Sequence, residues 1–316
     1  MATDSYAIEL SAPDITPYAA GNTGIPYVTS FDSGRAGPHV LLNALTHGNE
    51  ICGAIALDEI FRASVRPAIG ELTLSFANVA AYRRFDATDP SASRFVDEDF
   101  NRVWDTAVLD GSRASAELTR ARELRPLIDS ADLLLDIHSM QHATAPLMLA
   151  GLSDKCLNLA RRVGVPDLVI RDAGHAAGRR MRDYGGFSDA KSPKAALLVE
   201  CGQHWEKRAA EVAIETTWRF LAVSGVLTPA ESARILAASP RPQRVVTVTD
   251  AVTIASEHFE FAGDYRGLEV IPRAGTVIAR DGERDIRTPY EECVLIMPSR
   301  RLTRGQTAVR LGRFTG

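Results

Sequence analysis

The chain has 316 residues, of which 45% are hydrophobic and 24% are charged, and its formal net charge is −4. A chain of this length and composition buries a sizeable core, so it needs neither disulfides nor a metal merely to stay folded. The slightly acidic balance argues against a dedicated nucleic-acid-binding protein. No apolar run approaches the length of a membrane span, and the first residues do not resemble a signal peptide. Four widely spaced cysteines without a Cys-x-x-Cys pair favour reduced thiols, so we expect a cytoplasmic protein.

Apolar runs rich in Val, Leu and Ile alternate with helical patterns along the first two thirds of the chain. Each of these runs ends in polar residues, and they predict strands at 39–45, 71–78, 131–139 and 195–203. The helical patterns cover 51–63, 115–127 and 205–222. Near-continuous apolar strands indicate a sheet that is buried on both faces. We therefore predict an α/β fold with a central sheet flanked by helices, whose ligands gather at the carboxyl ends of the strands.

The composition changes near residues 238–244, where two prolines and several polar residues follow the last long helical pattern. We interpret this stretch as a linker. Beyond it, short alternating runs punctuated by glycine and proline predict a small β-rich domain. The expected division is a first domain over 1–240, which carries the α/β pattern, and a β-rich domain over 244–316. A long polar stretch at 83–105 carries four arginines, and long irregular loops in compact domains are often functional.

A histidine and a glutamate stand three residues apart where the first of these strands turns into a helix. His47 and Glu50 are suited to hold a cation, and a catalytic zinc site requires a third protein ligand. His138, at the end of the run 131–139, is the candidate, and Asp136 on the same face of that strand is suited to orient its imidazole. The alternative is structural: Thr46 or Asn49 caps the helix, and His138 is an ordinary buried histidine.

Glu200 also ends an apolar strand, where an unpaired carboxylate is costly. It is either the partner of a buried arginine or a general base that takes a proton from metal-activated water. Two further histidines compete as ligands, because His142 lies one helical turn after His138 and His204 lies four residues after Glu200.

Taken together, four motifs resemble the succinylglutamate desuccinylase/aspartoacylase family of the zinc carboxypeptidase clan. They are "HGNE" (47–50), "RFVDEDFNR" (94–102), "DIHS" (136–139) and "VECGQ" (199–203), and "PYEEC" (289–293) resembles a tyrosine-bearing segment of the family. Each motif alone is weakly specific, but their order and spacing match over roughly residues 38–225. The resemblance implies a zinc carboxypeptidase-like mixed sheet with a small C-terminal β-rich domain that caps the active site.

The resemblance also implies roles for individual residues. His47, Glu50 and His138 would hold one Zn²⁺ per chain, and Glu200 would be the general base and later the proton donor. Arg94 would stabilise the oxyanion. The substrate would be bound by Asn101, Arg102 and Tyr290. Arg102 suits a substrate carboxylate because a guanidinium offers two parallel donors to its two oxygens.

The chain departs from the family shortly before the strand that carries Glu200. Members that act on acidic substrates have an arginine and a tyrosine there, whereas this chain has "GGFSDA" (185–190). Arg182 is taken as the substitute, with Arg179, Arg180 and Tyr184 as neighbouring alternatives.

The resulting hypothesis is a zinc-dependent amidohydrolase that deacylates a small carboxylate-bearing N-acyl amino acid. The alternatives are a metallocarboxypeptidase that acts on short peptides and an inactive binding protein of the same fold. The two nitrogens and one carboxylate also fit manganese or cobalt. We expect a small-molecule substrate, no nucleic acid or membrane partner, and room for a homodimer.

Overall fold

The computed structural model describes residues 6–174, 177–238, 242–300 and 302–315. Its α-helices are α1 (Ile51–Arg62), α2 (Val79–Tyr82), α3 (Thr106–Asp110), α4 (Ala116–Ser130), α5 (Asp154–Val163), α6 (Lys207–Ser224) and α7 (Pro229–Ile235). Short 3-10 helices are η1 (Thr16–Tyr18), η2 (Phe100–Arg102), η3 (Met181–Asp183) and η4 (Gly185–Phe187). The strands of the first three quarters are β1 (Val28–Asp32), β2 (His39–Ala44), β3 (Glu71–Phe76), β4 (Leu133–Met140), β5 (Leu147–Leu149), β6 (Leu168–Arg171) and β7 (Ala195–Gln203). Those of the C-terminal part are β8 (Arg244–Thr253), β9 (Phe259–Phe261), β10 (Glu269–Ile271), β11 (Val277–Asp281), β12 (Arg284–Arg287), β13 (Cys293–Ile296) and β14 (Thr307–Phe314).

The predicted α/β class is confirmed, and the central sheet is mixed. Its strands follow the order β1-β3-β2-β4-β7-β5-β6-β8-β14-β13-β10. The neighbours β3, β2, β4 and β7 run parallel, whereas β1 and β5 run antiparallel to the strands β3 and β7. The four strands expected from apolar runs are β2, β3, β4 and β7, and the three expected helices are α1, α4 and α6.

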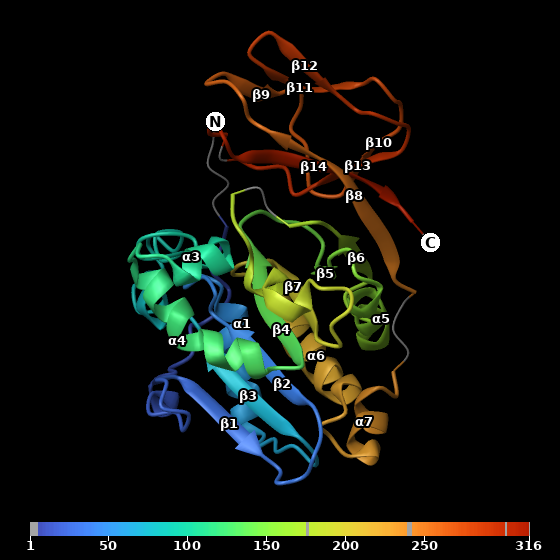
Figure 1. The fold of residues 1–316 in the computed structure, drawn as a ribbon. Helices are drawn as coiled ribbons and strands as arrows, with labels where there is room; N and C mark the ends of the chain where they lie inside the picture. The colour runs from blue at the N-terminus through green and yellow to red at the C-terminus, as the bar shows by residue number, and fades with distance from the viewer. Residues whose placement is uncertain (1–5, 175–176, 239–241, 301, 316) are drawn as a thin grey trace.

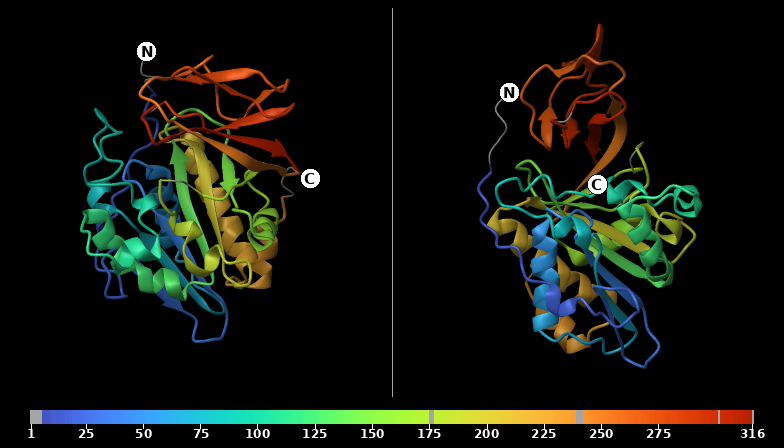
Figure 2. Two further views of the ribbon diagram at one scale, coloured as in Figure 1. Left: turned by 45° about the horizontal axis from the view of Figure 1, so that its top comes forward. Right: turned by 90° about the vertical axis from the view of Figure 1, so that its left-hand side faces the viewer.

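Helices cover both faces of the parallel strands, which explains why those strands are apolar on both sides (Figure 1). Successive residues of a strand point to opposite faces. In β2, Val40 and Leu42 pack in the larger core with helices α1, α5 and α6, while Leu41 packs in a second core with α4. Figure 2 shows the resulting layers, in which the sheet separates the two sets of helices.

The C-terminal part is β-rich, as predicted, but it continues the central sheet. The first residues of β8 pair in parallel with β6, and β8 also pairs along its length with β14. A smaller antiparallel sheet, in the order β12-β11-β9, stands above it (Figure 1). Residues 239–241 of the predicted linker lie outside the described residues. The division into domains 1–240 and 244–316 stays a prediction.

The four cysteines are buried and form no disulfide. Among the described residues, no helix is long and apolar enough to cross a membrane.

Gly48 occupies the tightest point of the turn that follows β2. A β-carbon there would lie 2.4 Å from backbone atoms of Ala81, Tyr82 and Ser93. The backbone N–H of Gly48 donates to the carbonyl oxygen of Arg94. Gly48 is therefore required by close contact between backbones, which fixes the turn that carries His47 and Glu50.

The change Gly48→Ala is expected to lower the free energy of unfolding by about 1–3 kcal/mol, because the added methyl group forces these backbones apart. Denaturant-induced unfolding measures the change. Gly263→Ala is the control, since a β-carbon there comes no nearer than 3.5 Å to its neighbours. Equal stability of the two variants would contradict the steric explanation.

Candidate active site

The candidate ligands and the candidate base meet at the carboxyl ends of β2, β4 and β7, as the α/β prediction requires. In the parallel pair of β4 and β7, His138 lies directly opposite Glu200. The chain leaves β2 through Leu45, whose φ is 60°, and reaches His47 in the turn that follows. Glu50 then precedes the first residue of α1.

His47, Glu50 and His138 present one ligand atom each within 4.8 Å of one another, and all three are buried. Nδ1 of His47 lies 2.7 Å from Oε1 of Glu50, and Nδ1 of His138 lies 2.7 Å from Oε2. Oε2 of Glu50 lies close to this nitrogen of His138 but has no hydrogen-bond partner among the described residues. Three converging ligand atoms of this kind form a group that can bind a metal.

The other nitrogen of each imidazole faces a carboxylate. Nε2 of His138 lies 2.8 Å from Oδ2 of Asp136, and Nε2 of His47 lies 2.9 Å from Oδ1 of Asp99. A carboxylate in this position fixes the tautomer and turns the opposite nitrogen toward a metal. Asp136 therefore lies where the sequence predicted it, whereas the contact of Asp99 with His47 was not predicted. Its signal was the acidic run 97–99, which follows Arg94 within the predicted functional loop.

Oδ1 of Asp136 accepts hydrogen bonds from Asn43 Nδ2 and Thr46 Oγ1, both at 2.8 Å. This buried network leaves the second carboxylate oxygen for His138. Thr46 thus serves the site through Asp136, and no side chain caps the start of α1.

The charges around the ligand group favour a divalent cation. Glu50, Asp99, Asp136 and Glu200 contribute four carboxylates, and Arg94 contributes one guanidinium. With neutral histidines these five groups carry a net charge of 1 − 4 = −3 when all are ionised. Burial opposes ionisation of Glu50, but the two neighbouring histidines hold its pKa well below the ordinary value. A buried anion of this kind is suited to a metal ligand.

The competing histidines have other environments. His204 is buried, and its Nδ1 lies 2.8 Å from Ser139 Oγ. Burial lowers the pKa of His204 to about 3, so it is neutral. His142 lines the cavity described below but does not join the ligand group among the residues that the structure describes.

Glu200 is buried beside the ligand group, and its Oε2 has no hydrogen-bond partner among the described residues. Burial raises the pKa of Glu200 to about 8, and the nearby carboxylate of Glu50 acts in the same direction. A cation bound at the ligand group would lower this pKa by direct attraction. The carboxyl group can therefore exchange a proton near neutral pH, which is what a general base and acid requires.

The long loop contributes a guanidinium and an amide to the same place. Nη2 of Arg94 lies 3.0 Å from both Asp99 Oδ2 and His47 Nε2. Asn101 Oδ1 accepts a hydrogen bond from the backbone of Met181, and its Nδ2 lies 3.3 Å from His138 Nε2. Arg102 donates to the carbonyl oxygen of Asn101.

The buried carboxylate of Glu117, on α4, holds this loop in place. It accepts hydrogen bonds from the backbone N–H groups of residues 96, 97 and 98 at 2.7, 3.0 and 3.2 Å. It also accepts one from Asn78 Nδ2. These hydrogen bonds fix the part of the loop that lies between Arg94 and Asn101.

The site opens into a cavity of about 980 Å³. His47, Glu50, Arg94, Asn101, Arg102, His138 and Glu200 all line it. The C-terminal part contributes further lining residues, which include Tyr265, Arg266, Arg300, Thr307 and Arg310. Both the α/β part and the β-rich part therefore bound the space next to the ligand group.

Two predicted substrate-binding residues lie elsewhere. Arg182 is buried beneath the cavity wall, where it contacts Asp183 and the carbonyl oxygen of Ala196, and it is not a lining residue. Its neighbour Arg180 lines the cavity instead. Arg180 precedes η3 and Arg182 lies within it, and the sequence spacing did not show which of the two lines the cavity.

The other is Tyr290, which belongs to the C-terminal core and does not line the cavity either. Its hydroxyl lies 2.5 Å from Thr249 Oγ1, and the guanidinium of Arg313 lies 3.7 Å from its ring centre. The tyrosine that lines the cavity from the C-terminal part is Tyr265.

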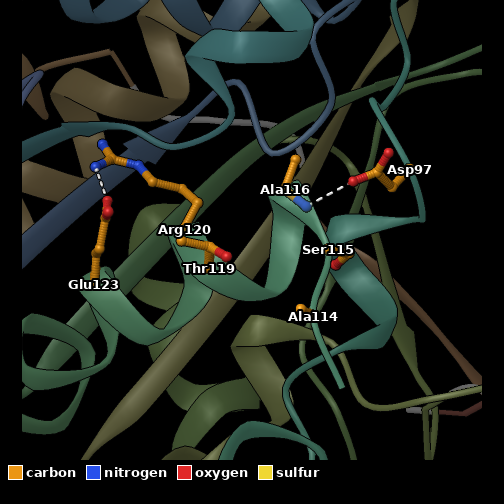
Figure 3. A pocket seen from close by; sticks show the side chains of 7 residues that line it. All are labelled: Asp97, Ala114, Ser115, Ala116, Thr119, Arg120 and Glu123. Carbon is orange, nitrogen blue, oxygen red and sulfur yellow. Dashed lines mark hydrogen bonds and ion pairs between the residues drawn. The ribbon is translucent and has the colours of Figure 1, made fainter. Parts of the chain in front are cut away.

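A second, shallow cavity of about 450 Å³ lies at the start of α4 (Figure 3). There Asp97 accepts a hydrogen bond from the backbone of Ala116, and Arg120 pairs with Glu123. It contains none of the candidate site residues, and its polar groups serve to cap and stabilise the helix.

Comparison with known proteins identifies one family. The model of the succinylglutamate desuccinylase/aspartoacylase catalytic domain matches residues 36–219, more than half of the chain. A comparison with curated proteins gives no match.

Solved structures share the fold at low sequence identity. Succinylglutamate desuccinylase from Chromobacterium violaceum aligns with a TM-score of 0.67 and 17% identity, over 92% of this chain and 89% of that one. The enzyme of the same name from Vibrio cholerae aligns with a TM-score of 0.64 and 16% identity, over 92% and 86%. The product-bound ectoine utilization protein EutE (DoeB) from Ruegeria pomeroyi aligns with a TM-score of 0.60 and 18% identity, over 90% and 88%.

Removing the negative charge of Asp136, which faces His138, tests whether His138 is a metal ligand. Asp136→Asn is expected to weaken the binding of a divalent metal ion by about 10- to 100-fold, because the amide no longer fixes and polarises the imidazole. Competition with a chromophoric chelator measures the affinity. Asp97→Asn is the control, since Asp97 caps α4 away from the ligands. Equal affinities in the two variants would argue against His138 as a ligand.

The loop anchor is tested by Glu117→Gln. An amide has one acceptor oxygen in place of two, so at least one backbone N–H loses its partner, and unfolding becomes easier by about 1–3 kcal/mol. Denaturant-induced unfolding measures this change. Glu123→Gln, on the exposed side of the same helix, provides the comparison. Identical unfolding midpoints of the two variants would show that Glu117 does not anchor the loop.

Proposed function

Because the chain belongs to the succinylglutamate desuccinylase/aspartoacylase family, we propose that it is a zinc-dependent deacylase that hydrolyses the amide bond of a small carboxylate-bearing N-acyl amino acid. The observation that carries this proposal is the convergence of His47 Nδ1, Glu50 and His138 Nδ1 beside the buried carboxyl group of Glu200. Two imidazoles and one carboxylate are a donor set of catalytic zinc sites, which keep three protein ligands and one open position.

Zinc bound by these three residues would supply Lewis-acid chemistry, since it makes water more acidic and polarises a carbonyl oxygen. Glu200 takes a proton from the attacking water and delivers it to the amine that leaves. Its burial beside the ligand group supports this role, because a carboxyl group with a raised pKa both accepts and returns a proton near neutral pH.

Arg94 lies close enough to the ligand group to stabilise the oxyanion that forms when water attacks the amide, because its guanidinium is within 3.6 Å of Glu50. Asp99 pairs with this guanidinium and holds its direction. Asn101 and Arg102 extend along the cavity from the same loop, and we assign them to a substrate carboxylate.

The shape of the site favours small substrates over peptides. Residues of both the α/β part and the C-terminal part bound the cavity that contains the ligand group. This supports a deacylase over a carboxypeptidase that binds an extended chain. An inactive binding protein is disfavoured because the ligand group, the base and the arginine are all present.

The test combines metal analysis with activity. Protein purified without chelators is expected to hold about one zinc per chain and to release free amine from members of a panel of N-acetyl, N-succinyl and N-formyl amino acids. Removal of the metal should abolish the release. Glu200→Gln should lower kcat by at least about 100-fold while zinc remains bound.

Glu98→Gln is the matched control, since Glu98 also lines the cavity but is bonded to Arg113 and Ser115. The proposal fails if the protein binds no zinc, or if the panel releases no amine. It also fails if Glu200→Gln is as active as the control.

A further inference from the structure

We propose that residues 6–10 form a strap that positions one wall of the cavity, and that Tyr6, at the end of this strap, limits the size of the substrate. The wall is the loop 141–146, which joins β4 to β5. This inference deepens the proposed function and rests on it for the identity of the reaction. It assigns specificity to a residue that lies outside the segment 36–219 that the family model matches.

The strap is a segment in which partly buried and exposed side chains alternate. Tyr6, Ile8 and Leu10 are partly buried and pack against the larger core, whereas Ala7 and Glu9 are exposed. A period of two residues is that of an extended chain, so one face of the strap is apolar and lies on the protein. The strap therefore has a defined position although it belongs to no helix or strand.

Two hydrogen bonds fasten the strap to the segment that follows β7, the strand that carries Glu200. The backbone N–H of Glu9 donates to the carbonyl oxygen of Trp205 at 2.9 Å. Oε2 of Glu9 accepts a hydrogen bond of 2.8 Å from the backbone N–H of Lys207, the first residue of α6. A carboxylate in this position satisfies an N–H group that has no partner within the helix and is attracted by the positive end of the helix dipole.

The strap ends at the cavity, where Tyr6 is a lining residue. The hydroxyl oxygen of Tyr6 accepts a hydrogen bond of 3.2 Å from the backbone N–H of Ala143. The ring centre of Tyr6 lies 6.3 Å from that of His142, within the usual range of aromatic pairs. Tyr6 therefore contacts the loop 141–146 through both its ring and its hydroxyl group.

Two other parts of the protein hold the same loop, which contains no helix or strand. Nε2 of Gln203, at the end of β7, donates to the carbonyl oxygen of Gln141 at 3.2 Å. Thr144 lies against Gly267 of the C-terminal part, where a β-carbon would come within 2.7 Å of Thr144 Cγ2. Tyr6 thus supports the stretch of the loop between these two contacts.

The position of this loop decides how much space remains beside the ligand group. Residues 140–144 line the cavity, and they directly follow the strand that carries His138. A wall that is fixed before the substrate binds cannot retreat from a longer group without losing its contacts to Tyr6. A well-packed pocket discriminates by about tenfold or more for each added methylene group. We therefore infer that the strap makes the site selective for short groups.

Hydrogen exchange tests whether Tyr6 holds the loop. Tyr6→Ala removes both the ring and the acceptor of the Ala143 N–H, so the amides of the loop 141–146 should exchange at least about threefold faster. Mass spectrometry of peptides that cover the loop measures the exchange. Tyr18→Ala is the matched control, because Tyr18 also packs partly buried on the larger core but stacks on Phe61 away from the cavity. Equal exchange of the loop in the two variants would overturn the strap.

Two substrate series test the effect on specificity. In one, the acyl group grows from acetyl to propanoyl to butanoyl on the amino acid that the panel selects. In the other, the N-acetylated amino acid grows from L-aspartate to L-glutamate to L-2-aminoadipate. In at least one series, kcat/KM of the unaltered enzyme should fall by about tenfold or more for each added methylene group.

Tyr6→Ala should reduce this fall to about threefold or less, mainly through KM, and should leave the zinc content unchanged. Tyr6→Phe should restore most of the size preference, because it keeps the ring. A kcat/KM that does not depend on length in either series would overturn the role of Tyr6 in specificity, and so would an unchanged size preference in Tyr6→Ala. Faster exchange of the loop in Tyr6→Ala, with no amine released by the unaltered protein, would instead refute the proposed reaction and retain the strap.

Discussion

The concentration of carboxylates at the ends of three parallel strands is the constraint on which the rest of this site depends. Glu50, Asp136 and Glu200 are buried within one network, and each would be strongly disfavoured there as an isolated anion. The fold meets this cost in different ways: hydrogen bonds from Asn43 and Thr46 satisfy Asp136, and two imidazoles face Glu50. Glu200 is left without such support, and its raised pKa is the consequence.

The different surroundings of Glu50 and Glu200 suit these two residues to different roles, metal binding and proton transfer. A carboxylate held between two histidines remains ionised and can stay bound to a cation, while a carboxyl group in a less polar setting can gain and lose a proton. The two groups are close because the strands β4 and β7 are in register, with His138 opposite Glu200. Strand register thus brings together residues that are 62 positions apart in the chain.

The loop between residues 83 and 105 is held in place mainly by hydrogen bonds to another element, since η2 is a 3-10 helix of only three residues. Its backbone N–H groups end on the carboxylate of Glu117, a residue of α4 with no contact to the ligand group. Asp99 then links the loop to His47, so the orientation of a ligand depends on an anchor in another helix. The C-terminal part completes the cavity from the opposite side, through residues that the continuous sheet places above the ends of β4 and β7.

The sequence by itself determined the strands and helices around the site and the residues that meet there. Long apolar runs predicted β2, β3, β4 and β7, and the polar residues at their ends predicted His47, Glu50, His138 and Glu200, because a polar group beside a buried strand is costly unless it has a use. Asp136 was predicted from the two-residue period of a strand, which is a local rule.

Tertiary structure decided what no local rule contains. Asp99 and Glu117 have their roles only because distant elements pack together. Local spacing also did not separate Arg180 from Arg182 or bring Tyr290 to the cavity, since the direction of a side chain in a 3-10 segment or loop depends on what packs around it. Strand periodicity is a property of the chain, whereas the partner that each polar group meets is a property of the fold.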